Sequence, residues 1–391
     1  MSNHLPFDGL VVVDFTHVLA GPACSYYLGL LGAHVIKVES ATKGDAIRHR
    51  GGTDAAGAAE GMSTSYLTQG AGKYAIALDL ASAEGLEIMH RLLAQADVFV
   101  ENHLPETLRA LGLHEDTVCD RHPHLIYCAM TGYGRGGPQE NAPAYDVNIQ
   151  ASCGIMEMTG TQESGPIRTG APILDYGTAL AAGFAVSAAL YGRTQIGTGA
   201  FVDVSMLETG FALMSSTVTD YMKTGNEPTR RGNASNSRSP GAGSFPCKDG
   251  MISLGVNEES QFVGLAKALD REDWLTDPRY AAGNARKANA ATLSQEVEAA
   301  LGSKSAAEWE PILQKAGVPC ARLRTMAEAL SSEQAQKRRF VYDIPESGIS
   351  VPTLPFRIAT SDPYVPSRAA PEIGADQDAV MAWLREREER A

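Results

Sequence analysis

The stretch LVVVDFTHVLAGP, residues 10–22, decides the fold expected for this chain. Its first part, LVVVDF, is a continuous apolar run of the kind found in parallel strands that are covered on both faces. After the loop THVLAG, Pro22 stands where proline is favoured, in the first turn of a helix that extends to about Leu31. A second apolar run, HVIKVE at residues 34–39, predicts another strand. Together these segments predict a β-α-β unit.

The same alternation continues along the first third of the chain. Strands are expected at residues 74–79, 97–101 and 125–130, and a helix at 83–94 has its large apolar residues on one face. Strands that alternate with helices indicate a parallel sheet with helices on both faces. The expected fold class is therefore α/β, with a large, doubly wound, Rossmann-like domain and a mainly parallel sheet.

A smaller α/β domain is expected after a change of composition at residues 225–243. That segment is rich in Gly, Asn, Ser, Arg and Pro and lacks apolar periodicity, which is typical of a linker or a flexible loop. A predicted strand and several predicted helices follow it. From about residue 331 the chain becomes proline-rich and is expected to pack back on the first domain. We therefore expect residues 1–223 and 330–391 to form the large domain and residues 224–329 the small one.

The chain of 391 residues is acidic, with 46 Asp and Glu residues against 33 Lys and Arg residues and a formal net charge of -13. Binding to a phosphate backbone needs a basic surface, so nucleic acid is not expected as a partner. An anionic small molecule would need a local cluster of positive charge.

The six cysteines form no C-x-x-C pair, a pattern typical of reduced thiols in the cytoplasm. No secretory signal is visible, and the longest uncharged stretch, residues 177–192, is shorter than the ~20 residues that cross a bilayer. It is expected to be a buried core helix, and no membrane partner is expected.

All nine histidines lie at or before His124 without metal-ligand spacing, so no metal site is expected.

Glu39 ends the second predicted strand, where dinucleotide-binding folds carry a ribose-binding carboxylate. The glycine fingerprint of those folds fails, because only Gly21 is available in the first loop. Glu39 is therefore expected to be a solvated strand end. The sequence also lacks the motifs of P-loop proteins and of the α/β-hydrolase nucleophile.

A set of further motifs occurs in a fixed order: DFTHVLAGP (14–22), HVIKVE (34–39), ALDL (77–80), VFVEN (98–102), TGYGRGGP (131–138), AYDVNIQASCG (144–154), RTGAPILDYGTAL (168–180) and VDVSMLET (202–209). This ordered set resembles the class III CoA-transferases, the family of formyl-CoA:oxalate and carnitine CoA-transferases, to which the α-methylacyl-CoA racemases are related. The resemblance runs from about residue 10 to 207 and continues more weakly through 245–255. It also implies a homodimer whose two chains interlock like links.

Asp175, in PILDYGTAL, occupies the place of the family's nucleophile, an aspartate that opens a helix of small residues. Free backbone N–H groups and the positive dipole end at a helix N-terminus favour the ionised form of a carboxylate. The same place suits a residue that only caps the helix, a role that Asp fills readily. The two roles are compatible.

The resemblance implies that CoA moves from an acyl-CoA donor to a carboxylic acid through two covalent forms of Asp175, an acyl anhydride and a CoA thioester. Coenzyme A and acyl-CoA are then substrates, and no metal, histidine base or tightly bound cofactor is implied. Because an anhydride hydrolyses easily, a closing loop should shield the site. Gly241 and Gly243 match the family's covering glycine loop, and a plain domain linker is the alternative.

Other positions match substrate-contacting residues of the family. Those that match CoA contacts are His17, Val18, Ala20, Leu78, Asn102, Tyr145 and Met206, and Leu19 stands near the acyl group. The basic contacts match less well, because Ser40 and Ala81 replace an Arg and a Lys, and Arg109 is displaced by one residue. The nearby candidates for holding the CoA phosphates are Lys37, Lys43, Lys73 and Arg109. Each of them is equally expected as a solvated surface charge.

Arg48 and Arg50, in GDAIRHRGG, follow the second strand where the family's substrate pocket varies. A guanidinium can hold a second carboxylate in bidentate fashion. These arginines motivate the hypothesis of a dicarboxylic substrate such as succinate or malate, with succinyl-CoA as a donor. Solvated surface arginines are the alternative.

Tyr145 separates the transferases from the racemases. The racemases carry a His at this position, paired with the equivalent of Asp175, because inversion needs an acid and a base on opposite faces of the substrate. A tyrosine with a pKa near 10 replaces it poorly. A 2-methylacyl-CoA racemase is therefore the second hypothesis, followed by a CoA-binding protein without turnover and a Rossmann-type oxidoreductase. A core aromatic residue is the alternative role for Tyr145.

Overall fold

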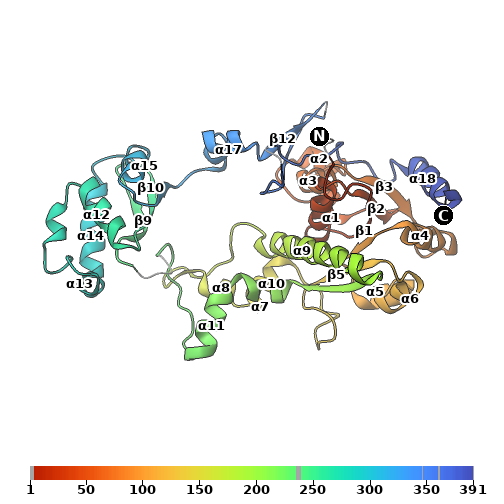
Figure 1. Cartoon of the computed structure of the whole chain (residues 1–391), viewed down its shortest axis with the longest axis horizontal. Coiled ribbons are helices and arrows are strands. Elements are labelled where there is room, and N and C mark those ends of the chain that lie inside the picture. The colour runs from red at the N-terminus through yellow and green to blue at the C-terminus, as the bar shows by residue number, and fades with distance from the viewer. Residues whose placement is uncertain (1–3, 235–238, 346, 360–361, 391) are drawn as a thin grey trace. The chain divides into compact units, whose positions relative to one another are not determined.

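The computed structural model describes residues 4–234, 239–345, 347–359 and 362–390. The chain divides into two compact units, coloured along the chain in Figure 1. The first unit comprises Met1–Glu157, Ile167–Pro228 and Gln336–Ala391, and the second comprises Met158–Pro166 and Thr229–Ala335.

A six-stranded parallel sheet forms the centre of the first unit. Its strands, in spatial order, are β3 (Tyr74–Leu78), β2 (His34–Ser40), β1 (Val11–Phe15), β4 (Val98–Glu101), β5 (Ile126–Thr131) and β8 (Ala200–Ser205). Every neighbouring pair is parallel. The order reverses between β1 and β4, as in doubly wound folds. The α/β class and the doubly wound domain with a parallel sheet, expected from the sequence, are therefore confirmed.

The helices of the chain are α1 (Ala20–Leu30), η1 (Ala46–His49), α2 (Ala55–Ala59), α3 (Thr64–Gly70), α4 (Ala83–Gln95), α5 (Pro105–Leu111), α6 (Glu115–Arg121), α7 (Asp146–Ser152), α8 (Ile155–Met158), α9 (Ile173–Ile196), α10 (Met206–Leu213), α11 (Ser215–Thr224), α12 (Glu259–Ala268), η2 (Glu272–Leu275), α13 (Gly283–Ala288), α14 (Ala290–Leu301), α15 (Ala306–Lys315), α16 (Met326–Leu330), α17 (Glu333–Arg338) and α18 (Gln377–Arg390). The 3-10 helices are η1 and η2. Two short antiparallel pairs are β6 (Gly160–Thr161) with β7 (Gly165–Pro166), and β12 (Val341–Ile344) with β13 (Ile349–Pro352).

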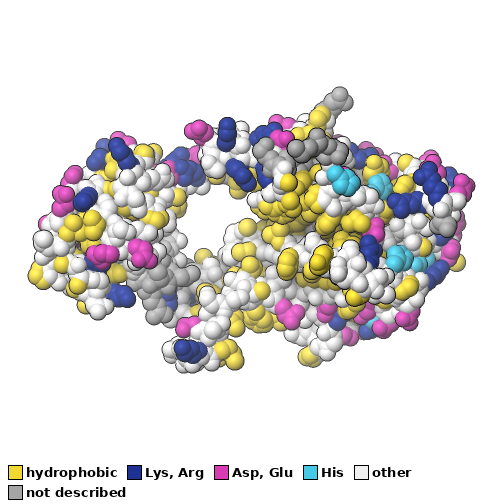
Figure 2. Space-filling model, in the orientation of Figure 1, with side chains coloured by type: hydrophobic (Ala, Val, Ile, Leu, Met, Phe, Trp, Pro, Cys, Tyr) yellow, Lys and Arg dark blue, Asp and Glu magenta, His cyan; other side chains and the backbone are white. Residues whose placement is uncertain are grey.

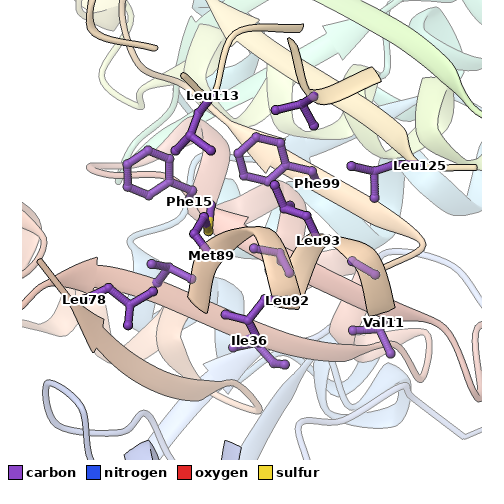
Figure 3. Packing of buried hydrophobic residues seen from close by; sticks show 14 of the residues in the cluster. Val11, Phe15, Ile36, Leu78, Met89, Leu92, Leu93, Phe99, Leu113 and Leu125 are labelled. Carbon is purple, nitrogen blue, oxygen red and sulfur yellow. The ribbon is translucent and has the colours of Figure 1, made fainter. Parts of the chain in front are cut away.

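Both faces of the large sheet are buried, which explains the continuous apolar runs of its strands. On one face, Leu92 and Leu93 of α4 pack with Ile36 and Phe99 of the strands (Figure 3). Helix α18 lies beside α4 and adds Leu384 to the same core (Figure 1). On the other face, α1 and α9 pack on the sheet and on each other. The loops that follow β1 and β4 are thus carried by a rigid, closely packed scaffold.

The second unit has an antiparallel sheet with the strand order β11 (Cys320–Arg322), β10 (Met251–Gly255) and β9 (Ala242–Pro246). Leu265 of α12, Leu293 of α14 and Trp309 of α15 join Trp274 in a core that is separate from that of the first unit. This core gives the smaller α/β unit its own hydrophobic stabilisation.

Helix α9 is buried along one face only. Ala182 and Val186 are fully buried, whereas Phe184 and Tyr191 are 79% and 71% exposed. Hydrophobic side chains reach the surface in the region of α9 in Figure 2. Within the described residues, α9 is also the one helix long and apolar enough to cross a membrane, which by itself is weak evidence. The prediction of a buried core helix at residues 177–192 is therefore wrong for its outer face, because its apolar residues extend around the helix beyond the sheet-facing side.

Candidate active site

A cavity of about 410 Å³ opens in the first unit beyond the carboxyl ends of β1, β4 and β5. This is the switch point of the sheet, where doubly wound folds bind ligands. The cavity brings together the sequence candidates Asp175, His17, Val18, Leu19, Ala20, Asn102, Tyr145 and Met206. Further lining residues include His103, Glu140 and Asn148.

Asp175 lies in the first turn of α9. The N-cap position of this helix is occupied by Pro172 and not by Asp175. The cap comes from another helix, because Asp146 of α7 accepts hydrogen bonds from the backbone N–H groups of Leu174 and Asp175. Its Oδ2 lies 2.8 Å and 3.2 Å from these nitrogens. The alternative role of Asp175 as the N-cap is therefore wrong, and its side chain is left facing the cavity.

Burial, followed by the charge of the nearby Asp146 carboxylate, raises the pKa of Asp175 to about 7. The expected stabilisation of the ionised form by the helix N-terminus is therefore wrong in sign. The main reason is burial of the carboxyl group, and in addition the N–H groups of Leu174 and Asp175 bind Asp146. Near neutral pH the Asp175 carboxyl group therefore exists in both protonation states.

The loop that joins β1 to α1 is held in a strained conformation at the edge of the cavity. Val18 has a φ of 68°, a left-handed conformation that is unfavourable for a β-branched residue. Neighbouring side chains hold this loop. The Val18 N–H donates to Asp45 Oδ1 at 2.9 Å, and Asn102 both accepts from His17 N and donates to His17 O at 2.8 Å. These hydrogen bonds set the positions of His17 and Leu19 in the cavity wall.

Gly21, in the first turn of α1, has a steric role. A Cβ at this position would lie 2.6 Å from the Thr16 side chain, so only glycine permits the loop to close so tightly on α1. The requirement is a close approach within the protein, which differs from the pyrophosphate contact of a dinucleotide fingerprint.

Two of the predicted phosphate ligands are buried beneath the loop. The Lys37 ammonium donates to Thr16 O at 2.9 Å and to Asp45 at 3.1 Å, while Lys73 donates to Asp14 at 2.7 Å. Both lysines are about 1% exposed. The prediction that they hold phosphates, and the alternative that they are solvated, are both wrong, because each ammonium is fully engaged with a buried carboxylate.

Arg48 and Glu39 form a second buried pair. Arg48 donates to both oxygens of Glu39, at 2.8 Å and 2.6 Å, and also to the hydroxyl of Tyr66 and the carbonyl oxygen of Pro371. Arg48 is 1% exposed and Glu39 is 4% exposed. Neither Arg48 as a substrate ligand nor Glu39 as a solvated strand end agrees with this arrangement, since each side chain is the buried partner of the other.

A second cavity of about 470 Å³ lies over the carboxyl ends of β1, β2 and β3, and it shares His17 and His103 with the first. The predicted contact Leu78 lines this second cavity, together with Ser40. Burial and the neighbouring His17 lower the pKa of His103 to about 3, so its ring is neutral at physiological pH. Among the described residues that line the two cavities there is no Lys or Arg.

A surface hollow beside the second cavity supplies the missing positive charge. Its lining includes the exposed residues Lys43, His49 and Arg50, and it shares Gly44 and Ala46 with the second cavity. Arg50 is therefore separated from Arg48 and belongs to an open, basic part of the surface.

The remaining sequence candidates are dispersed. Arg109 is half exposed, and its Nη1 lies 3.9 Å from Oε1 of Glu140. Gly241 and Gly243 belong to the second unit, where Gly243 pairs with Leu254 in the sheet. Tyr145 is 56% exposed, so its alternative role as a core aromatic residue is wrong. Within the described ranges, no group of three His, Cys, Asp or Glu residues is arranged to hold a metal ion.

Sequence reasoning missed Asp146, His103 and Asp45 as parts of the site. Asp146 and His103 directly follow the candidates Tyr145 and Asn102, so sequence adjacency was the available signal. Asp45 lies in the motif that contains Arg48, but its contact with Val18, 27 residues away along the chain, arises only on folding.

Comparison with known proteins identifies the family to which the chain belongs. The family model for CoA-transferase family III matches residues 7–377. The chain belongs to this family. It is 33% identical over 359 residues to human succinyl-CoA:glutarate CoA-transferase, covering 90% of this chain and 80% of that protein. It is 32% identical to acetyl-CoA:oxalate CoA-transferase of Acetobacter aceti, covering 94% and 93% of the two chains.

The family also has a solved structure of the same architecture. A CAIB/BAIF family protein from Brucella suis superimposes with a TM-score of 0.86 at 29% identity, covering 98% of this chain and 100% of that chain. The resemblance drawn from the ordered motifs is therefore confirmed. This CoA-transferase family III member is an enzyme that uses CoA thioesters, and its doubly wound unit carries a cavity that is lined in part by Asp175.

Proposed function

We propose that this family III CoA-transferase moves CoA between an acyl-CoA and a carboxylic acid with Asp175 as its nucleophile. The observation that carries the proposal is the state of the Asp175 side chain. It lies in the cavity at the switch point, and among the described residues no hydrogen bond or ion pair engages its oxygens. Glu140, the other carboxylate in the wall, accepts a hydrogen bond from Gly136 N and faces Arg109.

The reaction proceeds through two covalent forms of Asp175. The carboxylate attacks the thioester carbonyl of the donor, which forms a mixed anhydride and releases the CoA thiolate. The thiolate then attacks the aspartyl carbonyl, giving an aspartyl-CoA thioester and the free donor acid. An incoming carboxylate attacks this thioester to form a second anhydride, and the thiolate takes the new acyl group and regenerates Asp175. Each step exchanges one acyl bond for another, so no outside reactant is needed.

The two cavities of the first unit suit the two ends of CoA. The first cavity would take the thioester end beside Asp175, and the second cavity would take the nucleotide end, with the shared His17 and His103 along the path. Because Lys37 and Lys73 are engaged internally, the exposed cations Lys43, Arg50 and Arg109 are proposed to hold the phosphates. We also propose that the large domain, residues 1–223 and 330–391, binds CoA.

A dicarboxylic acid is the proposed acceptor class. The names of the human and Acetobacter relatives contain glutarate and oxalate, which are both dicarboxylic acids. Arg48 is excluded as the ligand of the second carboxylate because its guanidinium is fully engaged. Neutral donors in the cavity wall, such as Asn148 and Tyr145, are proposed to bind this carboxylate instead. Gly241 and Gly243 are retained as the proposed glycine loop that shields the anhydride from water.

Trapping of the covalent form tests the nucleophile. The enzyme is incubated with succinyl-CoA and hydroxylamine, and the peptide that contains Asp175 is analysed by mass spectrometry. A hydroxamate on Asp175 is expected, since hydroxylamine attacks an anhydride or thioester at its carbonyl carbon. If the adduct is absent and deuterium enters the α-carbon of a 2-methylacyl-CoA, the racemase hypothesis replaces the transferase proposal.

The rate of exchange is expected to fall with decreasing pH below about 7. Asp175 must be ionised to attack, and its pKa of about 7 places the loss in this range. Well below the pKa, kcat/KM should fall about tenfold for each pH unit. Measurement of kcat/KM against pH, with circular dichroism at each pH to verify folding, checks this expectation. A profile that stays flat down to about pH 5 contradicts it.

A homodimer is proposed because the outer face of α9 is apolar. Leu180, Phe184 and Tyr191 lie on this face at helical spacing and are exposed in the single chain. The resemblance to the family implies that the two chains of this dimer interlock.

The absence of disulfides among the six cysteines, all within the described residues, supports the proposed cytoplasmic location.

Phe184→Glu is expected to convert the dimer to a monomer. The substitution places a charge in the centre of the apolar face, where its desolvation opposes association. Light scattering coupled to size-exclusion chromatography should give twice the chain mass of 41.5 kDa for the parent and a single chain for the variant. Phe184→Leu, which retains apolar area, should remain dimeric. A monomeric parent would refute the proposal.

A further inference from the structure

Asp146 connects two helices at the reactive end of the cavity. Its Oδ2 accepts the N–H groups of Leu174 and Asp175, while its Oδ1 accepts the Gln150 amide at 2.5 Å. Gln150 is fully buried, and its Oε1 accepts Thr169 N at 2.9 Å. This chain of hydrogen bonds joins α7 to the segment that leads into α9, and the Asp146 carboxylate receives only donors, as an ionised carboxylate requires.

We propose that Asp146 is a positioning residue for Asp175, which fixes the first turn of α9 and places a second negative charge beside the nucleophile. The free enzyme then carries a repulsion between two carboxylates, and the repulsion is absent while Asp175 is in a covalent form. This inference rests on the proposed transferase mechanism.

Asp146 binds the N-terminal end of α9, and its charge therefore lies close to the Asp175 side chain. The N–H groups at the start of α9 bind Asp146, so they are withdrawn from Asp175. Burial raises the pKa of Asp175 to about 7, and the charge of Asp146 contributes in the same direction. When the Asp175 oxygen carries an acyl group, or its carbonyl carries CoA, Asp175 has no charge. Asp146 therefore stabilises the anhydride and the thioester relative to the free carboxylate.

Other titratable groups surround the pair, and their contributions are weaker. Those in the cavity wall and on the adjoining helices are His17, His103, Glu140, Tyr145, Cys153 and Tyr176. Among the described residues, Asp146 is the one charged group whose interaction with Asp175 changes its titration. Removal of the Asp146 charge should therefore have an effect that a purely structural defect would not produce.

Asp146→Asn tests the proposal because asparagine has nearly the same shape without the charge. The readout is modification of Asp175 by a water-soluble carbodiimide and an amine, followed over pH by peptide mass spectrometry, which tracks the protonated carboxyl group without needing activity. The midpoint is expected to move down by about one pH unit. In this variant, the equilibrium ratio of aspartyl-CoA to free enzyme after incubation with succinyl-CoA should be about tenfold lower than in the parent. A tenfold change in this ratio corresponds to the same free energy as a shift of one pH unit in the midpoint.

Asp54→Asn is the matched control. Asp54 caps α2 through a hydrogen bond from Gly57 N and lies outside the cavities, so this variant should leave both readouts unchanged. If Asp146→Asn fails to fold, as monitored by circular dichroism, Asp146→Ser removes the same charge and must shift the midpoint in the same direction. An unchanged midpoint in the folded variant overturns the inference. Absence of aspartyl-CoA in the parent instead overturns the proposed nucleophile, because the carbodiimide midpoint is independent of turnover.

Discussion

Asp175→Ala is expected to reduce CoA exchange by about 10³-fold or more, because no other group can form the covalent intermediates. Glu140, the second carboxylate of the cavity, has its own hydrogen bond from Gly136 N and the charge of Arg109 nearby. The measurement is the initial rate of CoA transfer from succinyl-CoA to an acceptor acid, with CoA binding followed separately by calorimetry. Binding should survive, since Asp175 contributes chemistry rather than affinity.

The stability of Asp175→Ala separates a catalytic from a structural role. Burial raises the Asp175 pKa from 3.8 to about 7, so the folded protein binds this proton more tightly than the unfolded chain. Stability is therefore lost as the pH rises from about 4 through 7. Above that range the alanine variant should be more stable than the parent, by an amount on the order of 3 kcal/mol in the free energy of unfolding. Urea unfolding at several pH values checks this.

Asp378→Ala is the control for Asp175→Ala. Asp378 is also an acidic residue in the first turn of a helix, α18, but it is exposed and lies outside both cavities. Its replacement should leave exchange at the parent rate. Full exchange by Asp175→Ala would refute the assignment of the nucleophile, and strong destabilisation above pH 7 would point to a structural role instead.

Asp14→Ala is expected to lower the free energy of unfolding by about 3–5 kcal/mol, because it leaves the Lys73 ammonium buried without its carboxylate. Burial alone would raise the pKa of Asp14, but Lys73 and Lys37 lower it to about 2, which shows how strongly the pair favours the charged form. Asp14 also accepts from Thr16 N, so the loop at the cavity edge should loosen with it. Chemical unfolding and CoA titration measure the two effects.

The double replacement Asp14→Leu with Lys73→Met is the matched comparison. Removing both charges leaves no unpaired ion, and an apolar pair of similar volume should destabilise the protein far less than Asp14→Ala. If the single and double variants lose equal stability, the cost lies in packing and the unpaired-charge explanation is wrong.

Much of the scaffold could be predicted from local patterns. The apolar runs at β1, β2, β4 and β5 were recognised to within a residue at their ends, because a strand buried on both faces must be apolar throughout. The outer face of α9 was misjudged, since the sequence shows that Phe184 is apolar but not whether another surface covers it.

The site was predicted less evenly than the scaffold. Asp175 was found because it stands at a helix start within a recognisable motif, and the cavity does contain it. Arg48 and Lys73 were misjudged because a cation in a sequence looks the same whether it faces solvent or a buried carboxylate. Their partners, Glu39 and Asp14, lie on strands 9 and 59 residues away along the chain.

By itself the sequence determined the α/β class and the family, and the resemblance to that family points to Asp175 as the proposed nucleophile. These follow from periodicity and from ordered motifs, which are local properties of the chain. Only the tertiary structure decided which charges are free, and it joined Asp146 to the first turn of the helix that carries Asp175. The physical reason is that desolvation and ion pairing depend on what surrounds a side chain in space, and folding brings those surroundings from distant parts of the sequence.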